Sequence, residues 1–372
     1  MARQSALREM EKKAMKAVSI SRAAAWAALV TLVLGMQTAI AEPLVYVPLG
    51  GEGKIVVVDA AKDEIVDTIS GVTAVHGLAG TPDGQLLIAG SYQEREAGGA
   101  TPAKPAGVTE DEHAAHHSAA PAGPKKDDAA ISTVSVIRTA DGSVVRRIDV
   151  PGAVHHVAVS PDGRYAVVTH PNEGTISAID LGSYEVVATV ATGPFPNYSA
   201  FGSDGRSVYV SNAGNNTVSA VDAGTWTVQW NAAVGEGPEH VVLSTDGRSL
   251  YVNNVEDGSV SVIGIAERQV VKTVPIGSTL HGIDLSDDGG TLFVADLGDD
   301  KVVAFDLATG THRSVRLAPA PYHLAAVRGA GKLYVSSADE PKVWVLDPET
   351  LAVLGEIPIG GTGHQMFLGP ST

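Results

Sequence analysis

The sequence predicts an all-β fold, a seven-bladed β-propeller of four-stranded antiparallel blades. A motif built around an Asp-Gly turn returns about every 42 residues, and short β-branched segments separated by Gly, Pro, Asp and Asn lie between its copies. Repeats of this length are typical of propeller blades, which bury their faces against neighbouring blades. The turns are Thr81-Pro82-Asp83-Gly84, Ser160-Pro161-Asp162-Gly163, Ser203-Asp204-Gly205, Ser244-Thr245-Asp246-Gly247, Ser286-Asp287-Asp288-Gly289 and a degenerate copy, Arg328-Gly329-Ala330-Gly331.

One copy shows the strand pattern of a blade. Val157–Val159 is expected to form the inner strand, and Tyr165–Val168 forms the second strand after the Pro161-Asp162-Gly163 turn. Thr175–Ile179 and Glu185–Val190 are expected to be the third and outer strands. Their β-branched residues favour strands, whereas the Gly, Pro, Asp and Asn between them favour turns.

The seventh blade is expected to be shared between the two ends of the domain, residues 42–372. Gln365 to Leu368 supplies an inner strand alone, and Leu44 to Val47 supplies a second strand with no inner strand of its own. Pairing these segments closes the ring and removes exposed sheet edges. We therefore expect deletion of either end to destabilise the whole domain.

Residues 1–41 have the features of a secretory signal peptide. Six Lys and Arg residues accompany an apolar run from Ala23 to Met36, and Ala39-Ile40-Ala41 is a small-x-small cleavage site. The apolar run is shorter than the roughly 20 residues of a membrane anchor. Translation from Met1, Met10 or Met15 would each retain this run. We expect export to the periplasm, with no membrane span after cleavage.

Charge and cysteine content exclude several classes of function. Of the 26 Lys and Arg and 42 Asp and Glu residues, six and two lie before residue 42, so the remainder carries a formal net charge of −20. Nucleic-acid binding depends on neutralising phosphates and is disfavoured, whereas a cation is electrostatically favoured. The chain has no cysteine, so disulfides, thiolate nucleophiles and cysteine-ligated metals are excluded.

A ring of histidines is the strongest functional signal. The position eight residues before each turn glycine holds His in most copies, and in a repeat fold such positions lie at one height. Neutral imidazoles suit zinc and copper, so we expect a zinc or copper site at the channel mouth. Inheritance from an ancestral repeat is the alternative explanation. The ring comprises His76, His155, Asn197, Glu239, His281, His323 and His364.

The ends of the second strands hold a further polar set, His170, Asn212, Asn254 and Asp296. His170 and Asp296 are candidate outer partners of the metal or additional ligands. His156 and His240 each follow a ring residue, so strand alternation predicts that they point away from the ring and pack. We assign no role to His312.

The blade that contains Ser91 is interrupted before Ile131 by an Ala-, Gly-, Pro-, Glu- and Lys-rich insertion at about 92–130. Such a composition buries too little apolar surface to fold, so we expect disorder. Its histidines, His113, His116 and His117, could capture a metal weakly, or could belong to a solvated acidic linker. The insertion joins the second and third strands, so we expect it on the same face as the ring.

The sequence resembles the exported YVTN-repeat (YncE-like) seven-bladed β-propellers. The resemblance lies in Tyr209-Val210-Ser211-Asn212, Tyr251-Val252-Asn253-Asn254 and Tyr334-Val335-Ser336-Ser337, together with the Ser-Pro-Asp-Gly turns, and covers Leu44 to Leu368. It implies the fold but not the chemistry, because such propellers serve as scaffolds, binding modules and enzymes.

Four functions fit these features. We expect a periplasmic metal-binding propeller, a zinc or copper chaperone or store whose partner would be a transporter, as for the zinc metallochaperone propellers. A copper oxidoreductase similar to nitrous oxide reductase or thiocyanate dehydrogenase would need an electron-transfer partner. A non-catalytic interaction scaffold is a further alternative. A lactonase-type hydrolase, in which a channel metal and acidic groups activate water, is disfavoured by the shortage of carboxylates in the ring.

Overall fold

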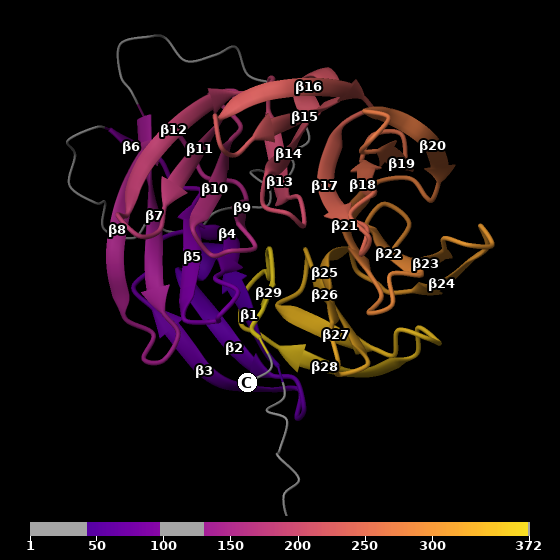
Figure 1. The fold of residues 1–372 in the computed structure, drawn as a ribbon. Helices are drawn as coiled ribbons and strands as arrows, with labels where there is room; N and C mark the ends of the chain where they lie inside the picture. Colours follow the sequence, from indigo (N-terminus) through magenta and orange to yellow (C-terminus); the bar gives the residue numbers. More distant parts are fainter. Residues whose placement is uncertain (1–42, 97–129, 371–372) are drawn as a thin grey trace, which may run out of the picture. The chain divides into compact units, whose positions relative to one another are not determined.

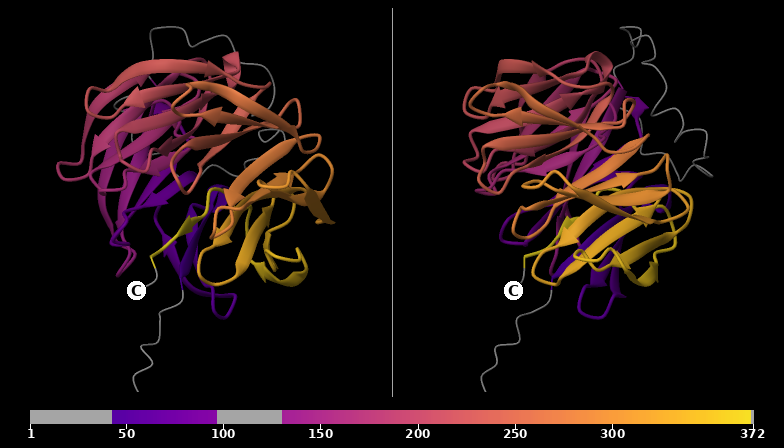
Figure 2. Two further views of the ribbon diagram at one scale, coloured as in Figure 1. Left: turned by 45° about the vertical axis from the view of Figure 1, so that its right-hand side comes forward. Right: turned by 90° about the vertical axis from the view of Figure 1, so that its right-hand side faces the viewer.

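The computed structural model describes residues 43–96 and 130–370, and it confirms the seven-bladed propeller (Figure 1). Each sheet places its inner strand near the central axis and its outer strand at the rim, as two further views also show (Figure 2). Within the described ranges, no helix has the length and apolar character needed to cross a membrane. The predicted signal peptide lies outside the described residues.

The strands follow the blades in chain order. The first blade contains β1 (Leu44–Leu49), β2 (Lys54–Asp59), β3 (Glu64–Ser70) and, from the other end of the chain, β29 (Phe367–Leu368). The second contains β4 (Val75–Gly80), β5 (Leu86–Ser91), β6 (Arg95–Glu96), β7 (Ala130–Arg138) and β8 (Val144–Pro151). The third contains β9 (Val157–Val159), β10 (Tyr165–His170), β11 (Thr175–Asp180) and β12 (Glu185–Ala191).

The remaining blades repeat this pattern. The fourth contains β13 (Pro196–Phe201), β14 (Ser207–Asn212), β15 (Thr217–Asp222) and β16 (Thr227–Ala233), and the fifth contains β17 (Pro238–Leu243), β18 (Ser249–Asn254), β19 (Ser259–Gly264) and β20 (Gln269–Pro275). The sixth contains β21 (Leu280–Leu285), β22 (Thr291–Asp296), β23 (Lys301–Asp306) and β24 (His312–Arg316), and the seventh contains β25 (Pro321–Val327), β26 (Lys332–Ser337), β27 (Lys342–Leu346) and β28 (Val353–Pro358). The two short 3-10 helices are η1 (Gly50–Glu52) and η2 (Ala213–Asn215).

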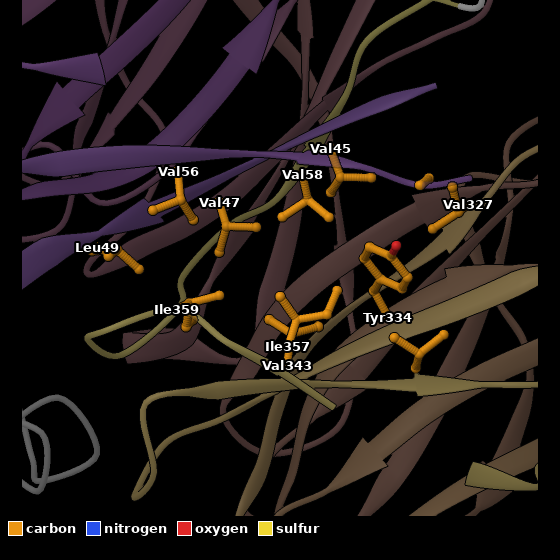
Figure 3. Close-up of a cluster of buried hydrophobic side chains, with 12 residues drawn as sticks. Val45, Val47, Leu49, Val56, Val58, Val327, Tyr334, Val343, Ile357 and Ile359 are labelled. Carbon is orange, nitrogen blue, oxygen red and sulfur yellow. The ribbon is translucent and has the colours of Figure 1, made fainter. Parts of the chain in front are cut away.

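Burial explains the β-branched composition. The four central residues of β2 are all buried, because a middle strand is covered on both faces by neighbouring blades. In the outer strand β3 only Ile69 is buried. Figure 3 shows one such interface, where Val47 and Val56 of the first blade meet Val343 of the seventh. Burying one such side chain contributes about 1.5–3 kcal/mol.

The ends of the domain close the ring as the sequence predicts. Val45 pairs with Leu368 and Tyr46 with Phe367 in antiparallel register. The second and third strands of the second blade, β5 and β7, flank the predicted insertion, most of which lies outside the described residues. The chain is described as far as β6, which adds a short fifth strand by pairing Arg95 with Ile131.

A bulge interrupts the channel end of most inner strands. In β17, Pro238 pairs with Asn254 and Val241 with Val252, so one extra residue lies between them. The same register shift occurs in β4, β13, β21 and β25. A bulge breaks strand alternation, so two successive side chains can turn toward the same side. This departure from regular strand geometry determines what lines the channel.

Candidate functional site

Seven histidines from six blades lie together at the channel end of the inner strands. Neighbouring imidazoles are close: the ring centroids of His76 and His155 are 4.3 Å apart, and those of His281 and His323 are 4.7 Å apart. All but His364, which is partly exposed, are buried. The group, called here the histidine cluster, comprises His76, His155, His156, His240, His281, His323 and His364.

The expectation that His156 and His240 point away from the ring is wrong. The ring of His156 lies 4.4 Å from that of His155, and the ring of His240 lies 4.5 Å from that of His281. The extra residue of the bulge cancels the alternation on which the prediction depended. Each inner strand therefore supplies two positions to the channel, which are called here the first and second bulge positions.

Strand pairing also corrects the alignment of His323. Pro321 pairs with Ser337 as Pro238 pairs with Asn254, so Tyr322 occupies the first bulge position and His323 the second. The degenerate turn after β25 shifted the sequence alignment by one residue. The second bulge positions are Gly77, His156, Tyr198, His240, Gly282, His323 and Gln365.

Backbone carbonyls orient two of the imidazoles. The Nδ1 of His156 lies 3.0 Å from the Asn197 carbonyl oxygen, which also accepts a hydrogen bond of 2.8 Å from the Thr169 hydroxyl. The Nδ1 of His76 lies 2.8 Å from the His155 carbonyl oxygen. An Nδ1–H that donates to a carbonyl leaves Nε2 as the basic atom, directed into the channel. Asn197 thus contributes to the site through its backbone.

Glu239 is the carboxylate of the site. It is buried, and its Oε2 lies 3.6 Å from His281 Nε2. Burial, followed by repulsion from Glu256, raises the pKa of Glu239 to about 8. The ring of Tyr322 lies 3.9 Å from that of His281 and covers the pair. Burial also raises the pKa of Tyr322, so its hydroxyl stays protonated at neutral pH.

Three overlapping groups of side chains have metal-ligating atoms within 4.8 Å of one another. They are His76, His155 and His156; His156, His240 and His323; and Glu239, His240 and His281. Of the predicted ligands, His364 contacts His76 at a ring distance of 4.4 Å but belongs to none of these groups. The loop histidines His113, His116 and His117 lie outside the described residues.

His170 and Asp296 lie outside these groups and bond within their own blades. Asp296 accepts hydrogen bonds from the backbone of Ser278 and Thr279, and pairs with Lys301 at 3.1 Å. His170 Nε2 lies 2.8 Å from the Ser177 hydroxyl, and its Nδ1 lies 3.2 Å from a backbone carbonyl. These contacts give both residues a structural role.

We expect His170→Asn to reduce the loss of stability in acid. Burial lowers the pKa of His170 from 6.5 to about 4. The unfolded chain therefore takes up this proton below about pH 6.5 while the folded protein does not, and stability falls as the pH drops toward 4. Wild type should lose roughly 2 kcal/mol more than the variant between about pH 7.5 and pH 5. Urea unfolding at the two pH values measures this difference.

The repeat itself indicates that asparagine fits this position. Asn212 and Asn254 occupy it in the next two blades, where their Nδ2 atoms donate to Ser219 and Ser261. Ser177 is the corresponding acceptor for His170→Asn. The exposed His312 on β24 supplies the control, His312→Asn, which should leave the pH dependence unchanged. Equal acid losses in wild type and His170→Asn would contradict the prediction.

One groove among the described residues is remote from the histidine cluster. It has a volume of about 720 Å³ and is lined by Asp83, Arg138, Asp162, Tyr184 and their neighbours. Asp83 belongs to the turn after β4, whereas His76 lies at the opposite end of that strand. This groove consists of ordinary inter-blade turns, and we assign it no chemistry.

Comparison with known proteins finds similarity to lactonase propellers. The family model described as "Lactonase, 7-bladed beta-propeller" matches residues 168–335. A periplasmic gluconolactonase from Pseudomonas aeruginosa has a TM-score of 0.67 at 18% identity, covering 89% of this chain and 99% of that one. A Bacteroides uniformis protein provisionally described as a 6-phosphogluconolactonase has a TM-score of 0.68 at 13% identity, covering 88% and 99%. A search of curated proteins gave no significant match.

Other propellers share the fold as well. A Kuenenia stuttgartiensis hydrazine synthase chain has a TM-score of 0.61 at 18% identity, covering 77% of this chain and 87% of that one. At such identities these likenesses show a common fold.

The expected function requires correction. We expected a zinc or copper chaperone or store, with a copper oxidoreductase or an interaction scaffold as alternatives. The family model and the gluconolactonase structures point instead to lactonase-type propellers. The lactonase alternative was disfavoured because the ring has one carboxylate. The structure shows that this carboxylate, Glu239, is buried beside an imidazole.

Proposed function

We propose that this protein is a lactone hydrolase that opens an uncharged sugar lactone to the hydroxy acid. The lactonase family match and the shared fold of the gluconolactonases support the reaction class. The observation that carries the proposal is the buried pair formed by Glu239 and His281, whose Oε2 and Nε2 atoms lie 3.6 Å apart. The signal-like residues 1–41 favour a periplasmic location.

The pair can perform both proton transfers of ester hydrolysis. In its ionised form, which predominates above its pKa of about 8, Glu239 accepts a proton from water as the water oxygen attacks the lactone carbonyl carbon, and His281 lies beside it. When the tetrahedral intermediate collapses, the ring C–O bond breaks, and the proton returns to the leaving alkoxide. The product is one hydroxy acid, and no oxidant or cofactor is consumed. We assign the Tyr322 hydroxyl, which burial keeps protonated, as the hydrogen-bond donor to the developing oxyanion.

Charge at the site favours a substrate without phosphate. Burial is the main cause of the pKa shifts of His76, Glu239 and Tyr322, and the neighbouring groups that add to these shifts are other histidines, carboxylates and a tyrosine. Among the described residues, the lysines and arginines that form ion pairs do so with carboxylates other than Glu239, as Lys301 does with Asp296. A phosphorylated lactone would need cationic partners, typically arginine. We therefore assign a neutral lactone to the site.

We expect Glu239→Gln to reduce the hydrolysis of glucono-δ-lactone by at least about 100-fold in kcat at about pH 8, where Glu239 is partly ionised, since the amide cannot accept a proton. Proton release in a pH-stat, corrected for the uncatalysed rate, measures this. The exposed Glu267 in the same blade provides the matched control, Glu267→Gln, which should remain active. A phosphorylated lactone should be hydrolysed less well. Wild type without activity on neutral lactones, or a fully active Glu239→Gln, would refute the proposal.

A further inference from the structure

We propose that His156, His240 and His323 bind a divalent transition-metal ion of the zinc class. This site adjoins the Glu239–His281 pair, since the His240 ring lies 4.5 Å from that of His281, but the inference does not rest on lactone hydrolysis. The three histidines come from the third, fifth and seventh blades and all occupy second bulge positions. Because equivalent positions in a repeat lie at the same height, the three imidazoles converge from alternate blades in one layer of the channel.

The distances fit metal ligation. The ligating atoms of the three side chains lie within 4.8 Å of one another. His156 Nε2 and His240 Nε2 face each other at 3.3 Å. Two nitrogens bound to tetrahedral zinc at about 2.0–2.1 Å lie about 3.3–3.4 Å apart. The separation is therefore close to that of two ligands of one ion.

The surroundings fix the ligand atoms. The Asn197 carbonyl accepts from Nδ1 of His156 at 3.0 Å, which leaves Nε2 with its lone pair toward His240. Protein metal sites commonly hold a histidine ligand in this way. The Tyr198 ring packs 4.5 Å from that of His156 and 4.8 Å from that of His240, and its hydroxyl is bonded to Gln365. Tyr198 therefore restricts the rotation of both imidazoles.

Core packing alone does not account for these residues. The three side chains are each at most 3% exposed, in a fold whose other buried positions are mainly Val, Leu, Ile and Ala. Gly77 and Gly282, at the same bulge position in other blades, show that the layer does not require a large side chain there. Neutral imidazoles suit zinc, copper and nickel. The formal net charge of −16 also favours a cation.

The test measures metal binding directly, on untagged protein. Chelator-treated protein is titrated with Zn²⁺ by calorimetry, and bound metal is counted by mass spectrometry after gel filtration. We expect one tight equivalent, and His323→Leu should weaken it by at least about 100-fold, because removing even an outer partner costs 10–100-fold. His240→Leu should do the same. His170→Asn, which alters a buried histidine outside the cluster, should bind as wild type does.

The outcomes separate this site from other sites and from the hydrolase. Circular dichroism and thermal unfolding verify that each variant is folded, and Co²⁺ in place of Zn²⁺ reports imidazole coordination by its visible spectrum. A tight equivalent that survives both His323→Leu and His240→Leu would overturn the site, as would wild type that takes up no zinc. Lactone hydrolysis without zinc binding would support the proposed function and reject this metal site. Zinc binding without lactone hydrolysis would support the metal site and reject the proposed function.

Discussion

Removal of residues 361–372 is expected to lower the unfolding temperature by at least about 10 °C. The deletion removes β29, which pairs with β1, and the Gln365 side chain, which joins three blades. Gln365 Oε1 accepts from the buried amides of Leu78 and Val157 at 3.1 and 3.2 Å, and its Nε2 donates to the Val157 carbonyl at 3.0 Å. Leaving such groups unsatisfied costs about 1–3 kcal/mol each.

The lost contacts sum to several kcal/mol. Phe367 and Leu368 also pack against two hydrophobic clusters that include residues of β1 and β2, and the ring of Phe367 lies 6.0 Å from that of Tyr46. For a domain of about 330 residues, 1 kcal/mol corresponds to roughly 1.5 °C, so a loss of about 7 kcal/mol gives the expected decrease. Differential scanning fluorimetry measures the change. The substitution Gln365→Leu, which removes the amide alone, should give a smaller decrease.

Deletion also exposes the edge of β1, so we expect the shortened protein to aggregate on heating. An unfolding temperature of the whole domain that stays unchanged after the deletion would contradict this prediction. Leu354→Ser on the exposed outer strand β28 is the control and should change the unfolding temperature by little. If the deletion behaved like this control, closure by β29 would not stabilise the ring.

The fold could be predicted because local chemistry repeats. The Asp residues of the turns bond the backbone two residues on, as Asp162 does with the Arg164 amide at 3.0 Å. These turns set the length of each strand pair. The β-branched segments between the turns are apolar, so they are buried between neighbouring blades. Closure followed from the same repeat, since Gln365 to Leu368 lacks a second strand of its own.

The site was predicted in part. We identified the first bulge position from the sequence because histidines recur there. We missed the second bulge position because we assumed that side chains alternate regularly along the inner strands. No single sequence feature marks the bulge. A proline before the pair in three blades, Pro196, Pro238 and Pro321, is the one signal that could have revealed it. Aligning the seventh blade on these prolines would also have placed His323 correctly.

The function was predicted wrongly because composition was given more weight than position. Many histidines and few carboxylates suggested metal storage. The ring has one carboxylate, Glu239, and the structure places it in a buried position beside the imidazole of His281, where the proposed hydrolase uses it. Sequence counts do not reveal which carboxylate is buried, because that depends on blades that are distant in the chain.

We expect Gly282→Ala to destabilise the protein by about 3 kcal/mol and to disturb His323. A Cβ atom at Gly282 would lie 2.6 Å from the Leu324 amide nitrogen and 2.7 Å from the Tyr322 carbonyl oxygen. Both contacts are with backbone in β25, which cannot yield as a flexible side chain does. Overpacking of this kind lowers the free energy of unfolding by about 1–3 kcal/mol. We expect a value near the upper end, because the atoms contacted belong to the rigid backbone of a paired strand.

The repeat and a third glycine provide matched comparisons. Gly77→Ala should have a similar effect, because a Cβ there would lie 2.7 Å from the His156 Cα atom. Gly355→Ala adds the same methyl group where no atom lies within 4 Å, so it should be neutral. Urea unfolding measures stability, and zinc titration measures the site. If Gly282→Ala and Gly77→Ala matched Gly355→Ala in both measurements, the close approach of the inner strands would not hold the second bulge positions in place. If they lost stability and zinc affinity together, the spacing between neighbouring blades would be what sets the separation of the three imidazoles.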